Sequence, residues 1–263
     1  MMSKISLREK LKNIYFTLIG FIPSIFFIFF SLNLIMKITR SVKPHYIENY
    51  NSIFKKIRFN KYNILEIGIG GHDLEHYKGG SLLMWKHYFL FSKIYGLDII
   101  KKNYNIFPRI KSFSGSQTDP STLNSILSEL KRVNIIIDDG SHYLDHIFFT
   151  FKYLFNHLSD NGIYIIEDIK MQFVKSVVDT PLDEISDPSL FFNTLIHKIN
   201  SSKFGEIIDD YYINNIYKII CYDRQIIIYK GKRKSKKSIN VFPSNKTSEG
   251  YIKISEEIYK ATK

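Results

Sequence analysis

Between Tyr62 and Ile166, short apolar runs alternate with segments whose apolar residues recur at helical spacing. Runs that are apolar at every position are typical of parallel strands covered by helices on both faces. Strands alternating with helices indicate a doubly wound, mostly parallel sheet of the α/β class. The runs predict strands over residues 63–69, 94–99, 109–113, 133–137 and 162–166. Helices are predicted over residues 81–91, 120–130, 145–158 and about 189–203.

Two further apolar runs close this region of the chain. Residues 216–222 and 225–230 are separated only by Asp223 and Arg224, which predicts an antiparallel hairpin with a tight turn. With the five preceding strands, the hairpin gives a seven-stranded sheet of Rossmann-like type. Residues 37–61 are interpreted as a polar, partly helical connection into the first strand.

The longest apolar stretch lies near the amino terminus. Residues 13–36 contain no charged side chain. About 20 apolar residues can cross a bilayer as a helix, and membrane helices tolerate glycine and proline, so Gly20 and Pro23 do not exclude a transmembrane helix here. Two alternatives stay open: a hydrophobic helix packed on the α/β domain, and a monotopic hairpin broken at Pro23. Basic residues flank both ends, so orientation is undecided.

Charge and cysteine content narrow the classes of partner. The chain has 263 residues and a formal net charge of +12 at pH 7. Part of the excess lies in the run 230–237, either a solvated tail or a contact with anionic lipid. No recognised nucleic-acid motif accompanies the charge, so nucleic acid is not an expected partner. The single cysteine, Cys221, excludes an internal disulfide. We expect three parts: a basic and apolar membrane-type segment (1–40), an α/β domain (41–232) and a basic tail (233–263).

Acidic residues follow two of the predicted strands directly. Asp138 and Asp139 end the fourth strand, shortly before His142, and Glu167 and Asp168 end the fifth. Ligands of open α/β sheets bind outside the carboxyl ends of the strands, so these side chains should share one crevice. Like charges gathered in one place are costly unless they share a cation or a proton. The residues therefore predict a hard divalent metal and a proton-transfer step.

The first two strands end in residues that suit a nucleoside cofactor. Glu66, Gly68 and Gly70 lie where the first strand turns, and glycines let the backbone approach a ligand closely. The spacing is not that of a dinucleotide site, and no phosphate-binding lysine follows. Asp98, at the end of the second strand, is placed to accept hydrogen bonds from ribose hydroxyls.

The motifs ExGxGG, LDI, GSQTDP, IIIDDGSH and GIYIIEDI occur in this order along the chain. In this order, the sequence resembles class I S-adenosylmethionine-dependent methyltransferases. More narrowly, it resembles the metal-dependent macrolide-sugar O-methyltransferases of the tylosin and mycinamicin pathways. Residues 79–86 (GGSLLMWK) match a glycine-glycine, serine-leucine, methionine-tryptophan helix of that family, and the terminal hairpin matches the end of its sheet. The resemblance covers about residues 45–232.

The resemblance implies two cofactors, S-adenosylmethionine and a Mg²⁺-type ion. The metal would be held by Asp138, Glu167 and Asp168, because hard cations choose oxygen ligands. His142 would be the general base, and Asp139 would support the metal or the base. The residues implied to bind S-adenosylmethionine are Glu66, Gly68, Gly70, Asp98, Ser116, Gln117 and Asp138.

The implied function is metal-assisted O-methyl transfer to a hydroxyl of a sugar, glycan or glycosylated small molecule. Metal coordination lowers the pKa of a hydroxyl, and a neutral histidine can take its proton. The enzyme would lie at the cytoplasmic face of a membrane or in the cytoplasm, and a homo-oligomer stays open. The alternatives are a catalytically inactive, membrane-anchored binding module and another enzyme on the same scaffold. Leu83, His87 and residues 170–173 depart from the family, so the acceptor, whose determinants we expect in residues 170–215, is not fixed.

Overall fold

A computed structural model describes residues 7–39, 43, 45–70, 80–102, 104–170, 181–200 and 210–232. Several predicted features lie outside these residues. They are the start of the basic lead, the glycines at 71 and 79, the basic tail (233–263), and residues 171–180 and 201–209 of the expected acceptor region.

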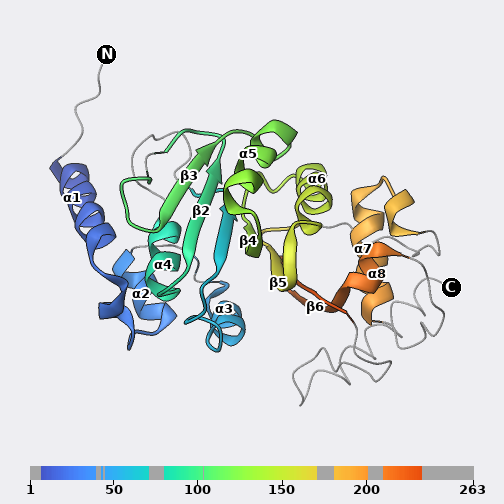
Figure 1. The fold of residues 1–263 in the computed structure, drawn as a ribbon, viewed down its shortest axis with the longest axis horizontal. Helices are drawn as coiled ribbons and strands as arrows, with labels where there is room; N and C mark the ends of the chain where they lie inside the picture. The colour runs from blue at the N-terminus through green and yellow to red at the C-terminus, as the bar shows by residue number, and fades with distance from the viewer. Residues whose placement is uncertain are drawn as a thin grey trace.

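Within the described part of the chain, seven strands form one sheet in the order β3-β2-β1-β4-β5-β7-β6 (Figure 1). Strands β1 to β5 pair in parallel, and β7 lies antiparallel between β5 and β6. This confirms the doubly wound α/β sheet and its terminal hairpin. The strands are β1 (Asn63–Ile67), β2 (Lys93–Asp98), β3 (Ile110–Ser114), β4 (Val133–Asp138), β5 (Leu158–Ile166), β6 (Ile216–Tyr222) and β7 (Gln225–Lys230).

Helices cover both faces of the sheet because successive strand residues point to opposite sides. Leu65 and Ile136 belong to a core cluster with α5, α6 and α7, whereas Ile64 and Ile135 pack with α2, α3 and α4 on the other face. The helices are α1 (Leu7–Phe21), α2 (Leu32–Thr39), α3 (Ile47–Phe54), α4 (Gly80–Tyr88), α5 (Pro120–Leu130), α6 (Leu144–Phe155), α7 (Pro188–Asn200) and α8 (Tyr211–Asn215), with 3₁₀ turns η1 (Ser24–Phe27) and η2 (Leu182–Glu184).

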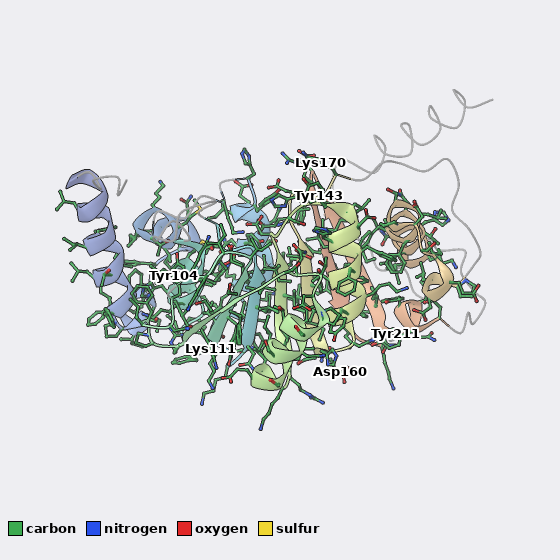
Figure 2. The ribbon with its side chains drawn as sticks, turned by 90° about the horizontal axis from the view of Figure 1, so that it is seen from above. Tyr104, Lys111, Tyr143, Asp160, Lys170 and Tyr211 are labelled. Atoms are coloured by element: carbon green, nitrogen blue, oxygen red, sulfur yellow. The ribbon has the colours of Figure 1, made fainter. Side chains whose placement is uncertain are left out.

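The parallel strands all end at one edge of the molecule. Tyr143 and Lys170, which follow β4 and β5, lie together at this edge in the view from above, whereas Asp160, in the first part of β5, lies at the opposite edge (Figure 2). The two acid-bearing loops predicted to meet therefore do share one edge of the sheet.

The apolar amino-terminal segment is not one helix. Helix α1 ends at Phe21, Pro23 precedes η1, and α2 begins only at Leu32. A proline has no backbone N–H to continue the preceding helix. Among the residues that the structure describes, no helix has the length and apolar character needed to cross a membrane. The expected transmembrane helix over residues 13–36 is therefore not supported, and the alternative of packing on the α/β domain matches the structure.

Cationic and polar side chains of the α/β domain hold the broken segment in place. Lys86 donates to the carbonyl oxygens of Gly20 and Ile22, and Arg58 donates to those of Phe27 and Phe30. Helical hydrogen bonding stops in this stretch, so carbonyl oxygens here can accept from outside donors; that of Phe27 also accepts the Phe30 N–H. The segment also supplies side chains to the core, including Leu32 and Ile35.

This docking gives a physical reason for one departure from the family pattern. His87 stands where the family often has an acid, and here its ring stacks on Phe27 with centroids 4.1 Å apart. Its Nε2 lies 3.0 Å from the carbonyl oxygen of Ile19. Burial lowers the pKa of His87 to about 3, so the ring is neutral. A carboxylate at this position would face the carbonyl oxygen of Ile19, which repels it.

Candidate functional site

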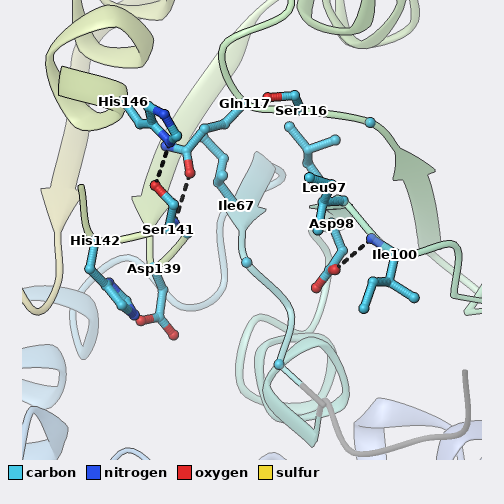
Figure 3. A pocket seen from close by; sticks show the side chains of 15 residues that line it. Ile67, Leu97, Asp98, Ile100, Ser116, Gln117, Asp139, Ser141, His142 and His146 are labelled. Carbon is cyan, nitrogen blue, oxygen red and sulfur yellow. Dashed lines mark hydrogen bonds between the residues drawn. The ribbon is translucent and has the colours of Figure 1, made fainter. Parts of the chain in front are cut away.

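A pocket of about 520 Å³ opens at the carboxyl edge of the sheet, between the loops after β1, β2, β3 and β4 (Figure 3). It is lined by Gly68, Gly70, Asp98, Ser116 and Gln117, together with Asp139 and His142. Five of the seven residues predicted to bind the cofactor thus line one pocket. Glu66 and Asp138 do not line it, and the structure gives each a different place.

Position 68 requires a glycine because two loops approach each other closely there. Its φ of +77° lies in the left-handed region, and a Cβ built there would lie 1.9 Å from the carbonyl oxygen of Asp139. Only glycine avoids both problems. The glycine therefore lets the β1 and β4 loops meet at the pocket wall.

Asp98 is held in a fixed orientation at the end of β2. The backbone N–H groups of Ile69 and Ile100 donate to its two carboxylate oxygens at 3.2 and 2.9 Å, and Figure 3 shows the bond from Ile100. Lys102 lies 3.1 Å from the same carboxylate. A carboxylate fixed in this way at a pocket wall is suited to accept hydrogen bonds from a ligand's hydroxyl groups.

Asp138 lies beneath the pocket rather than in it. Its carboxylate accepts hydrogen bonds from Gln117 Nε2 and from the Tyr164 hydroxyl, both at 3.2 Å. Gln117 Oε1 in turn accepts the backbone N–H of Ser141 at 2.9 Å. Burial raises the pKa of Asp138 to about 7. Asp138 therefore orients the pocket residue Gln117.

Of the two adjacent acids, it is Asp139 and not Asp138 that lies beside His142 and Asp168. Carboxylate and imidazole atoms of Asp139, His142 and Asp168 all lie within 4.8 Å of one another. Strand residues alternate between faces, so the last residue of β4 turns into the core and the first residue beyond it is free to face the crevice. Figure 3 shows the His142 ring directed at the Asp139 carboxylate.

His142 and Asp168 both have left-handed backbones, with φ of +60° and +51°. Such conformations are uncommon outside glycine and cost about 1 kcal/mol or more, so they cluster at functional sites. Nδ1 of His142 is buried without a hydrogen-bond partner among the described residues. These observations mark the loops after β4 and β5 as arranged for a ligand.

Three donors from the segment before and within α3 reach the acids, and the sequence analysis did not anticipate them. Lys43 Nζ lies 2.8 Å from both Asp139 Oδ2 and Glu167 Oε2, and 3.2 Å from Glu66 Oε1. The Tyr46 hydroxyl donates to Asp168 Oδ1 at 2.8 Å. The Tyr50 hydroxyl donates to Glu167 Oε1. Tyr46 and Tyr50 are four residues apart, a spacing that repeats on one helical face, but no local pattern indicates Lys43.

Burial dominates the electrostatics of this cluster. It raises the pKa of Glu66 and of Glu167, because charged carboxylates lose their hydration there. Burial alone would lower the pKa of the Lys43 ammonium, but the carboxylates, with Glu167 foremost, hold it well above its ordinary value. Glu66 is fully buried and paired with Lys43, which explains why it does not line the cofactor pocket.

The donor set fits a hard divalent cation. Asp139 and Asp168 present carboxylate oxygens beside an imidazole, and the carboxylate of Glu167 contacts the same Lys43 ammonium as Asp139. Oxygen donors are what Mg²⁺ prefers. Asp168 is one-third exposed and lies 2.9 Å from Arg224 of the hairpin turn, so the cluster is reachable from solvent.

The chain is similar in sequence to antibiotic-pathway methyltransferases, although no protein-family model matches it. It is 41% identical to demethylmacrocin O-methyltransferase of Streptomyces fradiae over 126 residues, 48% of this chain and 31% of that protein. It is 40% identical to mycinamicin VI 2''-O-methyltransferase of Micromonospora griseorubida, also over 126 residues, with the same coverage of each chain. The matched part is thus about one third of the length of these relatives.

A solved structure extends the similarity to most of the fold. It is the MycE methyltransferase from the mycinamycin biosynthetic pathway, in complex with Mg and SAH, with a TM-score of 0.64 and 28% identity. The alignment covers 86% of this chain and 59% of that one. The resemblance noted from the motifs is confirmed. The homologues are macrolide-sugar O-methyltransferases, and the fold is that of class I S-adenosylmethionine-dependent methyltransferases.

Proposed function

We propose that this chain is an S-adenosylmethionine-dependent, metal-assisted O-methyltransferase that acts on a hydroxyl of a sugar, glycan or glycosylated small molecule. One observation carries the proposal. A single pocket combines a fixed carboxylate suited to ribose, Asp98, with His142 and Asp139 of an acidic cluster. The relatives, which are O-methyltransferases by name, and the MycE structure with Mg and SAH support the same chemistry.

The cofactor would lie across the ends of β1, β2 and β3. Asp98 would accept hydrogen bonds from the ribose hydroxyls, and the backbone around Gly68 and Gly70 would approach the methionine part. Ser116 and Gln117, at the opposite wall of the pocket, would contact the adenine. Asp138 would act only by orienting Gln117.

Asp139, Glu167 and Asp168 would hold the divalent cation. When bound, it supplies Lewis-acid polarisation, which lowers the pKa of a coordinated acceptor hydroxyl. His142 lies among these acids and would take the hydroxyl proton. The acceptor oxygen would form a bond to the methyl carbon of the cofactor as the carbon–sulfur bond breaks. The products are the methyl ether, S-adenosylhomocysteine and protonated His142.

The test is calorimetric titration of S-adenosylmethionine into the full chain, with methyl transfer to sugar-bearing acceptors measured in parallel. We expect Asp98→Ala to abolish cofactor binding and His142→Ala to abolish transfer. Asp160→Asn is the matched control, because it removes an exposed carboxylate at the opposite edge of the sheet. Cofactor binding without turnover on any acceptor would favour the inactive binding module, and absence of cofactor binding would refute the proposal.

We also propose that the chain docks peripherally on anionic membrane surfaces. The support is a group of exposed apolar side chains on α1, on η1 and just after η1. Phe29 is 94% exposed, Phe26 68% and Leu18 63%, and the basic Lys37 is exposed nearby on α2. Water contact with apolar side chains is costly, and the net charge of +12 favours anionic lipid.

Flotation with vesicles tests this docking. We expect binding to vesicles rich in phosphatidylserine, little binding to phosphatidylcholine alone, and loss of binding in the double variant Phe26→Ser, Phe29→Ser. Tyr222→Ser is the control, since Tyr222 is an exposed aromatic on β6, at the far end of the sheet. A dimer that the double variant dissociates, with no lipid binding, would instead assign the face to a second copy of this chain.

A further inference from the structure

The Lys43 ammonium lies between the carboxylates of three strand ends. Its partners are Glu66 in β1, Asp139 after β4 and Glu167 after β5. The side chains of Lys43, Glu66 and Glu167 are 6%, 0% and 2% exposed. The three carboxylates thus form a site for a cation, and the ammonium of Lys43 occupies it.

This ammonium uses the oxygens that a divalent cation would use. Nζ lies 2.8 Å from Asp139 Oδ2 and 2.8 Å from Glu167 Oε2, so it lies between the two ligand atoms. A divalent cation binds such oxygens at still shorter range, and two cations on the same oxygen pair repel strongly in a buried site. The ammonium and the metal therefore exclude each other from this position.

We propose that Lys43 is a tethered internal cation that fills the position between Asp139 and Glu167 until a divalent cation displaces it, and thereby sets the metal affinity of the site. Lys43 is thus a positioning residue, and the inference rests on the metal site of the proposed function.

Two features show how the exchange is accommodated. Glu66, fully buried and 3.2 Å from Nζ, keeps a carboxylate beside the ammonium when it leaves the other two acids. Tyr46 and Tyr50 donate to oxygens of Asp168 and Glu167 that Lys43 does not contact. The hydroxyl groups hold the acids in place in either state.

Binding of Mn²⁺ to the full chain, followed by electron paramagnetic resonance of the free ion, tests the inference. Lys43→Met keeps most of the length of the side chain and removes the competing charge. We expect it to bind Mn²⁺ at least about tenfold more tightly, because a buried ion pair no longer has to be broken. Lys43→Arg should bind no more tightly than the natural chain. Lys61→Met, at an exposed position, is the control for general loss of charge.

Removal of Lys43 leaves buried acids without their cation, so the variant is also followed by thermal unfolding. We expect Lys43→Met to melt lower than the natural chain without metal and to gain more stability from Mn²⁺. In the natural chain, the ¹⁵N-labelled Lys43 ammonium signal should change as Mg²⁺ saturates the site, a reading that needs no variant.

The outcomes distinguish a failure of the Lys43 inference from a failure of the proposed metal site. Mn²⁺ binding that is unchanged or weaker in a folded Lys43→Met chain, or an ammonium signal unaffected by saturating Mg²⁺, would overturn the inference alone. Absence of Mn²⁺ binding in every chain would overturn the proposed metal site and the inference with it.

Discussion

Asp138→Asn should remove a pH-dependent loss of stability. The carboxyl group is 1% exposed, and burial raises its pKa from 3.8 to about 7. Asparagine is nearly isosteric, and its amide can still pair with Gln117 and Tyr164. The substitution therefore removes the ionisation while keeping most of the packing.

The sign and the size follow from the two pKa values. Below about pH 4 the group is protonated in the folded and unfolded chains, so it costs nothing. Between about pH 4 and 7 the unfolded chain releases the proton and the folded chain keeps it, so stability falls as pH rises. The loss is about 1.4 kcal/mol per pH unit, and it reaches about 4 kcal/mol above pH 7, where it levels off.

Urea unfolding at pH 4.5, 5.5 and 6.5, in buffer without divalent cations, measures this loss. The stability of Asp138→Asn relative to the natural chain should rise by about 3 kcal/mol between the first and last pH. Other buried acids contribute equally to both chains, so they cancel in the difference. Asp160→Asn, which removes an exposed carboxylate, should show no such trend. A difference that stays constant with pH would refute the assignment of Asp138 as a buried, proton-holding group.

Three further predictions follow from contacts at and around the site. Asp139→Asn should weaken Mn²⁺ binding at least about tenfold, whereas Asp138→Asn should leave it nearly unchanged; equal losses would restore Asp138 as a ligand. Gly68→Ala should lower the free energy of unfolding by about 1–3 kcal/mol and weaken cofactor binding in calorimetry, since its Cβ would meet the Asp139 carbonyl. Lys86→Met should cost about 1–3 kcal/mol in urea unfolding by leaving the Gly20 carbonyl without its donor, and an unchanged midpoint would contradict that role.

The predictable parts of this molecule are those set by local pattern. Apolar runs gave the strands, and strand ends gave the pocket residues Gly68, Asp98 and Gln117, because parallel strands bring their carboxyl ends to one edge. Which of Asp138 and Asp139 faces the pocket was not predictable in this way. A shift of one residue reverses the face, and the last residue of a strand is hard to fix from sequence.

The contact of Lys43 with the acids was not predictable from the sequence for a different reason. Lys43 contacts residues that are 96 and 124 positions away in the chain, and nothing in its own neighbourhood indicates acids. The expectation of a transmembrane helix over residues 13–36 rested on composition alone. The conformation of this segment also depends on cationic side chains of distant elements. Arg58 and Lys86 supply the donors that let the chain break near Pro23 and pack on α4.

The docking of the amino-terminal segment makes it part of the cooperative folding unit rather than a detachable leader. Ile35 and Phe27 share a core cluster with Trp85 and Ile135, so trimming the segment uncovers the interior of the sheet. Lys43 follows α2 by only a few residues. Helix α2 and the acid-bearing edge of the sheet should therefore exchange amide hydrogens with linked protection.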